Sequence, residues 1–211
     1  KDSQCEIITQ ISMSPFSLYF VSVSLDRSIC LWNLSNFQQL LKIENAHADW
    51  INAVAIAPNN QYFVTGSQDE TVTLWDVFDN KFCYKFEDAH EGTVSTVSLF
   101  GDKYLASASN DRSIAIWDLQ NKTLVHRFNN AHKDVIYSVV VTSDNKYIVS
   151  GSLDRTLSIW DVEKRALLHR FENAHDGAIR SVAVTADSKY IITGSTDKSI
   201  AIWGNKLVHR F

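Results

Sequence analysis

The sequence predicts an all-β fold in which five similar four-stranded antiparallel sheets are arranged around a common axis. The first observation is a repeat, because tryptophans recur every 42 or 43 residues and an aspartate lies six residues before each. The second is that short runs rich in Ile, Val and Tyr, separated by turn formers, fill the repeat. A period of this length is typical of architectures whose units bury each other's apolar faces. The markers are Trp32, Trp75, Trp117, Trp160 and Trp203, with Asp26, Asp69, Asp111, Asp154 and Asp197.

The last repeat shows the elements most clearly. Residues 179–185, 190–194 and 199–203 are predicted strands, and a fourth strand follows each tryptophan after a polar turn, as at 167–171. Four short strands cannot bury both faces of their own sheet, but sheets stacked radially can, which is the propeller solution. With only 7 glycines and 2 prolines we expect no linker. Residues 1–211 are therefore predicted to form one domain, with repeats at about 1–43, 44–86, 87–128, 129–171 and 172–211.

Composition narrows the classes of protein. With 45% hydrophobic and 21% charged residues the chain is globular, and no apolar run approaches the roughly 18 to 20 residues that span a bilayer. Lys and Arg number 20 against 24 Asp and Glu, a balance of −4 that argues against nucleic acid as the partner. Three widely spaced cysteines, Cys5, Cys30 and Cys83, indicate a reducing compartment, so we expect a cytoplasmic or nuclear protein.

Each later repeat offers a histidine, a hydroxyl, an aspartate and a tryptophan in the same order. An indole N–H donates, a hydroxyl accepts and donates, a neutral imidazole does both, and a carboxylate accepts. A relay in this order leaves no buried polar group unmatched, although the spacing does not decide between neighbouring hydroxyls such as Thr65 and Ser67. The same residue types form nucleophilic triads. Because the set recurs four times, whereas catalysis needs one exposed nucleophile, we interpret it as structural and predict no catalytic residue.

The tryptophan-aspartate endings at Trp75, Trp117 and Trp160 complete a pattern that resembles the WD40-repeat family over the whole chain. Departures are Ala-His in place of the family's Gly-His, Asn33 and Gly204 after two of the tryptophans, and Gln4 at the first histidine position. The resemblance implies a β-propeller, an interaction scaffold and no cofactor. It also implies four hydrogen-bonded tetrads: His47, Thr65, Asp69 and Trp75; His90, Ser107, Asp111 and Trp117; His132, Ser150, Asp154 and Trp160; and His175, Thr193, Asp197 and Trp203.

The number of blades leaves two arrangements open. The resemblance implies seven blades as the commonest number, whereas five repeats are present. The chain begins with a predicted inner strand at 7–13 and ends with a predicted outer strand at 206–211. If residues 206–211 completed the first sheet, Gln4 would follow Phe211 at the spacing seen from Phe86 to His90. That spacing favours a closed five-bladed ring over an incomplete part of a seven-bladed propeller.

Candidate binding residues flank the histidine and aspartate turns, at positions that vary while their neighbours repeat. Trp50 is the one tryptophan outside the repeat register, and with Tyr137 and Arg180 it forms the residue mixture that dominates interface energetics. The alternative is that Trp50 shields its own blade. The predicted partner-binding residues are Trp50, Asn52, Gln68, Ser95, Asn110, Tyr137, Leu153, Arg180 and Thr196.

Basic residues also recur in the predicted outer strands. We interpret this column as protection against edge-to-edge pairing rather than as a site for an anionic partner, because acidic residues follow closely. The remaining histidines, His126, His169 and His209, lie one per blade, so no metal site is predicted. The column consists of Lys42, Lys85, Arg127, Arg170 and Arg210.

These patterns favour a non-catalytic scaffold that binds proteins or peptides within a larger assembly. Two alternatives stay open at this point. One is recognition of nucleic acid or histone tails; the other is a small-molecule or enzymatic site in the central channel, against which stand the Val, Ala and Ser side chains of the inner strands.

Overall fold

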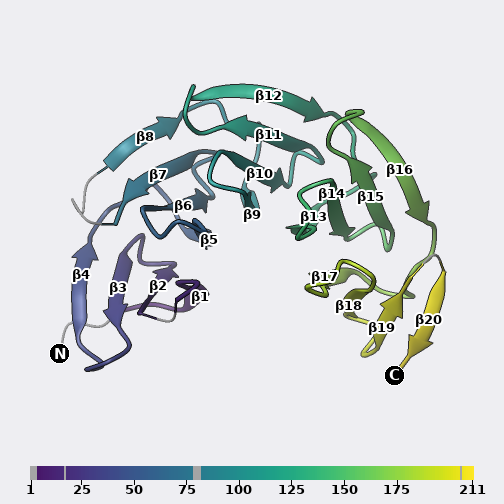
Figure 1. The fold of residues 1–211 in the computed structure, drawn as a ribbon, viewed down its shortest axis with the longest axis horizontal. Helices are drawn as coiled ribbons and strands as arrows, with labels where there is room; N and C mark the ends of the chain where they lie inside the picture. The colour runs from purple at the N-terminus through teal and green to yellow at the C-terminus, as the bar shows by residue number, and fades with distance from the viewer. Residues whose placement is uncertain (1–3, 17, 78–81, 205) are drawn as a thin grey trace.

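Five four-stranded antiparallel sheets make up the molecule, as the sequence predicts (Figure 1). The computed structural model describes residues 4–16, 18–77, 82–204 and 206–211, and these residues form strands and turns without a helix. No helix of this part is therefore long and apolar enough to span a bilayer. Each sheet lies inside one of the five predicted repeats.

The strands follow one another in chain order, four to a sheet. The first sheet holds β1 (Ile8–Met13), β2 (Tyr19–Ser24), β3 (Ile29–Asn33) and β4 (Gln39–Ile43). The second holds β5 (Ile51–Ile56), β6 (Tyr62–Ser67), β7 (Val72–Asp76) and β8 (Phe82–Phe86). The third holds β9 (Val94–Phe100), β10 (Tyr104–Ser109), β11 (Ile114–Asp118) and β12 (Thr123–Phe128). The fourth holds β13 (Ile136–Val141), β14 (Tyr147–Ser152), β15 (Leu157–Asp161) and β16 (Ala166–Phe171), and the fifth β17 (Ile179–Val184), β18 (Ile191–Ser195), β19 (Ile200–Trp203) and β20 (Leu207–Arg210).

The sheets are arranged as an open arc. The first strand of each sheet lies on the inner side of the arc and the fourth on its rim, and the first and fifth sheets lie at opposite ends (Figure 1). The expectation that residues 206–211 complete the first sheet and close a ring is wrong, because β20 pairs with β19. Residues 39–43 supply the first sheet's own outer strand as β4.

A hydrophobic cluster lies between each pair of neighbouring sheets. Between the first and second sheets, Val21 and Ile29 share a cluster with Val54 and Phe63, and none of the four is more than 2% exposed. Burying one such side chain contributes roughly 1.5–3 kcal/mol. Each internal sheet is thus stabilised from both sides.

Hydrogen bonds between inner strands reinforce this packing. Polar side chains on one inner strand accept hydrogen bonds from backbone N–H groups of the next inner strand, which fixes the register between the two sheets. The N–H groups of Val54, Val139 and Val182 donate to the side chains of Gln10, Thr96 and Ser138, at 2.7, 3.5 and 3.1 Å respectively.

In the second and fourth sheets, close approach of the next sheet leaves room only for glycine at one position of the second strand. A Cβ on Gly66 would lie 2.5 Å from a methyl carbon of Val94, and one on Gly151 would lie 2.5 Å from a methyl carbon of Ile179. Gly194 occupies the same position in the fifth sheet, where a Cβ would meet nothing within 4 Å. The glycines at 66 and 151 are therefore needed by the neighbouring sheet rather than by their own backbone.

Candidate partner-binding face

The third sheet shows the polar relay that underlies the face with the histidine turns. Trp117 Nε1 donates to Ser107 Oγ at 2.9 Å, and the same oxygen lies 2.8 Å from His90 Nε2. On the other side of the ring, His90 Nδ1 lies 2.9 Å from a carboxylate oxygen of Asp111. All four members that the resemblance implies are therefore in contact in this sheet.

The fourth sheet repeats these contacts. Ser150 Oγ lies 2.7 Å from His132 Nε2 and accepts from the indole N–H of Trp160 at 2.8 Å. His132 Nδ1 lies 3.1 Å from a carboxylate oxygen of Asp154. Ser150 thus takes the place of Ser107, as the resemblance implies.

The fifth sheet has a threonine at the bridging position. Thr193 Oγ1 lies 2.7 Å from His175 Nε2 and accepts from the indole N–H of Trp203 at 2.8 Å. His175 Nδ1 lies 2.9 Å from a carboxylate oxygen of Asp197. Serine and threonine are therefore interchangeable here, because each supplies one hydroxyl.

The structure decides which hydroxyl takes part in the second sheet. Thr65 bridges His47 and Trp75, and His47 Nδ1 lies 3.0 Å from Asp69. Ser67 instead donates to the carbonyl of Trp50 at 2.8 Å and accepts from the backbone N–H of Asp69. Spacing could not separate the two hydroxyls, because they are two residues apart on one strand and point to the same face.

A further hydroxyl joins each relay. Ser113 lies two residues after Asp111, and its oxygen is 3.0 Å from His90 Nδ1. The sequence interpretation missed this group, although a Ser or Thr follows every repeat aspartate at this distance. Its counterparts are Thr71, Thr156 and Ser199.

Glutamine replaces histidine in the first sheet and preserves most of the relay. Trp32 Nε1 donates to Ser22 Oγ at 2.9 Å, and Ser22 donates to Gln4 Oε1 at 2.7 Å. Gln4 Nε2 donates to the carbonyl of Ser28 at 2.9 Å. A primary amide can therefore stand in for the imidazole, because it too has a donor and an acceptor.

The protonation states of Asp111 and His90 agree with the donor and acceptor roles that the relay requires. Burial would raise the pKa of Asp111, but hydrogen bonds from His90 and Ser113 outweigh it and hold that pKa well below its usual range. Burial lowers the pKa of His90 against the opposing effect of Asp111, so the imidazole is neutral at pH 7. Neutral His90 donates to the carboxylate and accepts from Ser107, as the relay requires. The pKa values of Asp69, Asp154 and Asp197 are lowered in the same way.

These groups are closed off from solvent. The side chains of the four relay histidines are fully buried. The hydroxyl residues that they contact, Thr65, Ser107, Ser150 and Thr193, are each 0% exposed. A hydroxyl that accepts from an indole and donates to an imidazole has no free path to a substrate or partner. These residues are therefore part of the fold rather than of a binding surface, and the relay stabilises the loop that enters each sheet.

The predicted partner-binding residues divide into two groups. Asn52 and Ser95 are partly buried and donate to backbone carbonyls of the next inner strand, at Val94 and Ile136, so the fold itself uses them. This differs from the expectation that packing leaves these positions unconstrained. Gln68 donates to Asp49, and Thr196 accepts from the N–H of Ala178. The exposed members are Trp50, Asn110, Leu153, Arg180 and Thr196, and Tyr137 is half-buried beside Arg180.

Tyr137 and Arg180 form the clearest contact of this second group. The Arg180 guanidinium lies 3.8 Å from the centre of the Tyr137 ring, between β13 and β17. Trp50 is 47% exposed and lies on the second sheet, and no contact among the described residues joins it to this pair. The structure therefore brings together two of the three residues that the sequence singled out.

The basic column of the outer strands serves the fold. Arg127 donates to the carbonyl of Ala89 at 2.7 Å, and Arg170 and Arg210 reach the carbonyls of Ala131 and Ala174 in the same way. Lys42 and Lys85 instead form ion pairs with Glu44 and Glu87 at 3.0 and 3.2 Å. The arginines thus tie the outermost strand of a sheet to the turn that precedes its histidine.

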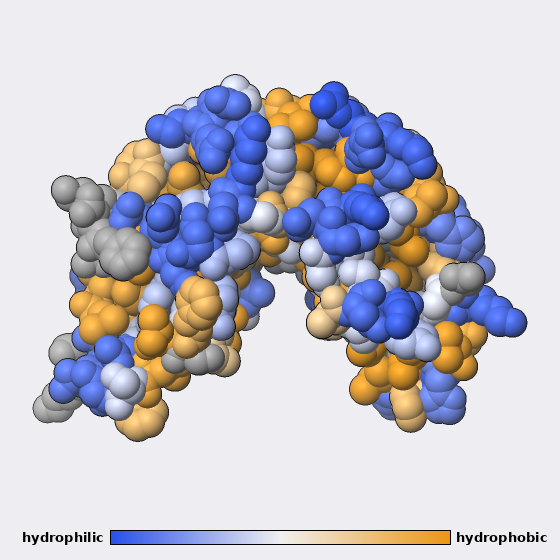
Figure 2. Space-filling view, in the orientation of Figure 1, coloured by the Kyte–Doolittle hydropathy of each residue, from blue (hydrophilic) through white to orange (hydrophobic). Residues whose placement is uncertain are grey.

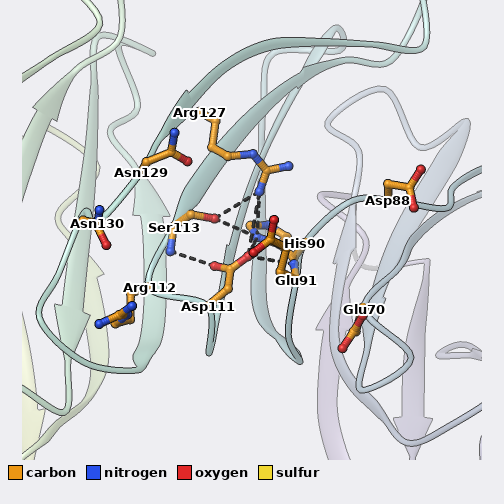
Figure 3. A pocket seen from close by; sticks show the side chains of 10 residues that line it. All are labelled: Glu70, Asp88, His90, Glu91, Asp111, Arg112, Ser113, Arg127, Asn129 and Asn130. Atoms are coloured by element: carbon orange, nitrogen blue, oxygen red, sulfur yellow. Dashed lines mark hydrogen bonds and ion pairs between the residues drawn. The ribbon is translucent and has the colours of Figure 1, made fainter.

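A polar pocket of about 870 Å³ opens beside the third sheet's relay (Figure 3). The Arg127 guanidinium points at Asp111, His90 and Ser113, whereas Glu70 and Asp88 lie on the opposite side of the pocket (Figure 3). Because the chain itself satisfies Arg127, this basic group is not available to a ligand. The lining residues are Glu70, Asp88, His90, Glu91, Asp111, Arg112, Ser113, Arg127, Asn129 and Asn130.

The outer histidines pack on aromatic rings. His126, His169 and His209 lie edge-on to Phe128, Phe171 and Phe211, with ring centres 4.3–4.6 Å apart. In the described part of the chain, no three His, Cys, Asp or Glu side chains gather in a way that could hold a metal ion.

Comparison with known proteins gives the family. The family model described as "WD domain, G-beta repeat" matches residues 2–33, 38–76, 80–118, 122–161 and 165–204. The chain belongs to the WD40 family. No curated protein matches it. Among solved structures it is similar to "Structure of U3-55K", with a TM-score of 0.92 and 22% sequence identity, over 100% of this chain and 65% of that one.

That likeness shows the fold alone, and this chain spans about two thirds of the length of that neighbour. WD40 repeats generally serve as protein-interaction scaffolds, usually without enzymatic activity, and often within complexes.

Proposed function

We propose that this chain is a non-catalytic scaffold that binds a carboxylate-bearing peptide or protein segment on the face with the histidine and aspartate turns. The observation that carries the proposal is the stacking of the Arg180 guanidinium on the Tyr137 ring at 3.8 Å.

This pair departs from what the fold does elsewhere at the same position. The equivalent residues of the first three sheets, Thr9, Asn52 and Ser95, donate to a carbonyl of the next inner strand. Tyr137 and Arg180 stack on each other instead. The stack joins the same two inner strands without a hydrogen bond to a carbonyl, so the N–H groups of Arg180 remain available to a partner.

The chemistry of Arg180 selects the partner. Arg180 is exposed, and within the described residues no hydrogen bond or ion pair joins its guanidinium to another group. Stacking on Tyr137 holds the guanidinium plane in one orientation, which favours bidentate binding of a planar carboxylate. The partner we propose therefore presents Asp, Glu or a C-terminal carboxylate at this point.

Trp50 extends the same face. It stands at a position filled by Thr93, Val135 and Ala178 in later sheets, so packing does not require an aromatic there. At 47% exposure it offers a large apolar contact at low entropic cost. We propose that it contacts the same partner at a second point.

The cysteines are the basis for the cellular location that we propose. Burial raises the pKa of Cys30 to about 11, so this thiol is protonated and packs as a small apolar group. Together with the uneven number of cysteines, this supports a reducing, cytoplasmic or nuclear location.

The test is quantitative affinity capture from cell extract with three forms of the chain. The double variant Tyr137→Ala/Arg180→Ala should lose, by about tenfold or more, a defined set of proteins that the unchanged chain retains. The control is Lys146→Ala, which removes an exposed basic residue at the opposite end of the fourth sheet's inner strands. Equal capture by all three forms, with folding intact by circular dichroism, would refute this site.

A further inference from the structure

The polar pocket between the second and third sheets is lined by three carboxylates that the described part of the chain does not pair. Its volume of about 870 Å³ lies in the range of ligand-binding clefts. No hydrogen bond or ion pair within the described residues joins the carboxylates of Glu70, Asp88 and Glu91 to another group. Both sheets have a neighbour on either side, so the pocket does not arise from an uncovered end of the arc (Figure 1).

The backbone holds these three groups near one another. The N–H of His90 donates to the carbonyl of Glu70 at 3.2 Å, which places the turn between β6 and β7 against the turn that precedes β9. That second turn carries Asp88 and Glu91. The N–H of Glu91 also donates to a carboxylate oxygen of Asp111 at 3.0 Å. The three carboxylates therefore stand on backbone that the relay of the third sheet already fixes.

The fold does not require acidic residues at these positions. The turn residue that is Glu70 in the second sheet is basic in the other four, although its φ lies between 67° and 72° in all five. Asp88 takes a place that is asparagine before the other three relay histidines, and Glu91 takes one that is lysine in the fourth sheet. The three acids thus distinguish this pocket from its counterparts. The residues equivalent to Glu70 are Arg27, Arg112, Arg155 and Lys198, and those equivalent to Asp88 are Asn45, Asn130 and Asn173.

The opposite side of the pocket presents amide groups. Asn129 and Asn130 lie there, across from Glu70 and Asp88 (Figure 3). A primary amide both donates and accepts, so these two side chains are suited to the backbone of a bound peptide. On the face seen in Figure 2, hydrophilic side chains gather over the second and third sheets. The pocket therefore favours a polar ligand over an apolar one.

We propose that this pocket binds a basic side chain, arginine or lysine, of a peptide or protein segment. The guanidinium or ammonium group pairs with the free carboxylates through charge-assisted hydrogen bonds, and the backbone beside it pairs with the amides. Arg127 does not take this place, because it donates to the carbonyl of Ala89 at 2.7 Å. The pocket is separate from the Tyr137–Arg180 pair between the fourth and fifth sheets, so either proposal can fail without the other.

Titration with the capped pentapeptide acetyl-Ala-Ala-Arg-Ala-Ala-amide, up to about 10 mM and followed by NMR of the chain, tests the proposal. Glu70→Arg reproduces the residue found at the same place in three other sheets, so folding should be unaffected, which circular dichroism checks. Glu163→Arg is the matched control, because it makes the same change of charge in an exposed turn of the fourth sheet. A second peptide with glutamate in place of arginine tests the sign of the charge.

The unchanged chain and Glu163→Arg should bind the arginine peptide saturably, with shifts at the backbone amides of Glu70 and Glu91. Glu70→Arg should bind it at least about tenfold more weakly, because like charges then meet in the pocket. The glutamate peptide should not bind. The proposal would be overturned if the unchanged chain showed no saturable binding, if the two variants bound the arginine peptide equally, or if the glutamate peptide bound as well as the arginine peptide.

Discussion

At the scale of the residue, the relay explains why the same four side-chain types recur at the same distances. Each member supplies the donor or acceptor that its neighbour needs, and burial makes any unmatched group costly, by about 1–3 kcal/mol. Gln4 shows that the requirement is for hydrogen-bonding capacity rather than for histidine itself.

The lowered pKa of His90 predicts loss of stability in mild acid. Because this pKa lies below its value in the unfolded chain, the unfolded state binds the proton more readily, and the free energy of unfolding decreases as pH falls below about 6.5. His90→Gln, which reproduces the amide found at Gln4, removes this titration and should flatten the dependence. Urea unfolding at pH 7 and pH 5 measures it, and an unchanged slope in the variant would contradict the assignment.

The buried Nε of Arg210, which lacks a hydrogen-bond partner among the described residues, indicates where a substitution should stabilise the fold. Arg170 Nε donates to Ser158 Oγ at 2.9 Å, whereas the buried Nε of Arg210 has no partner among the described residues, because Ala201 stands opposite it. Ala201→Ser should raise the free energy of unfolding by about 1 kcal/mol, and Ser158→Ala should lower it by about as much. Thermal or urea unfolding of the two variants checks both signs, and a destabilised Ala201→Ser variant would count against the pairing.

At the scale of the element, each strand is shaped by the sheet beside it as much as by its own sequence. The strand runs could be predicted to within about a residue or two from Ile, Val and Tyr content and from the turns between them. The outer strand β4 (Gln39–Ile43) lies after Trp32, where a fourth strand was predicted for each repeat, and the error was to assign residues 206–211 to the first sheet as well.

Alanine substitution at the three equivalent glycines should change the free energy of unfolding by different amounts, although the chemical change is the same. Gly66→Ala and Gly151→Ala should destabilise the chain by roughly 1–3 kcal/mol, because the new methyl group collides with Val94 or Ile179 of the next sheet. Gly194→Ala should be neutral or slightly stabilising, since nothing lies within 4 Å and alanine restricts the unfolded chain. Urea unfolding of the three variants measures these changes, and equal effects at all three sites would show that the glycines serve their own backbone.

At the scale of the whole molecule, the repeat period was enough to predict five sheets, but not how they close. Local sequence patterns describe residues that are close in the chain, whereas closure depends on contacts between the first and last sheets. The spacing from Phe211 to Gln4 therefore predicted a shared sheet that the structure does not contain. The same limit applies to the binding face. Variation between repeats selected Asn52 and Ser95, which form hydrogen bonds between adjacent inner strands. It selected Tyr137 and Arg180, which stack on each other, by the same criterion. Variability alone does not distinguish these roles, because it does not show what a side chain contacts.

The most direct test of this account is hydrogen exchange of the indole N–H groups, followed by NMR on the folded chain. The indole groups of Trp32, Trp75, Trp117, Trp160 and Trp203 donate to hydroxyl oxygens at 2.8–2.9 Å. Five of the six indole signals should therefore exchange slowly, and the signal of the half-exposed Trp50 should be lost first. Rapid exchange of the five, or protection of Trp50 equal to theirs, would contradict both the buried relays and the exposed face.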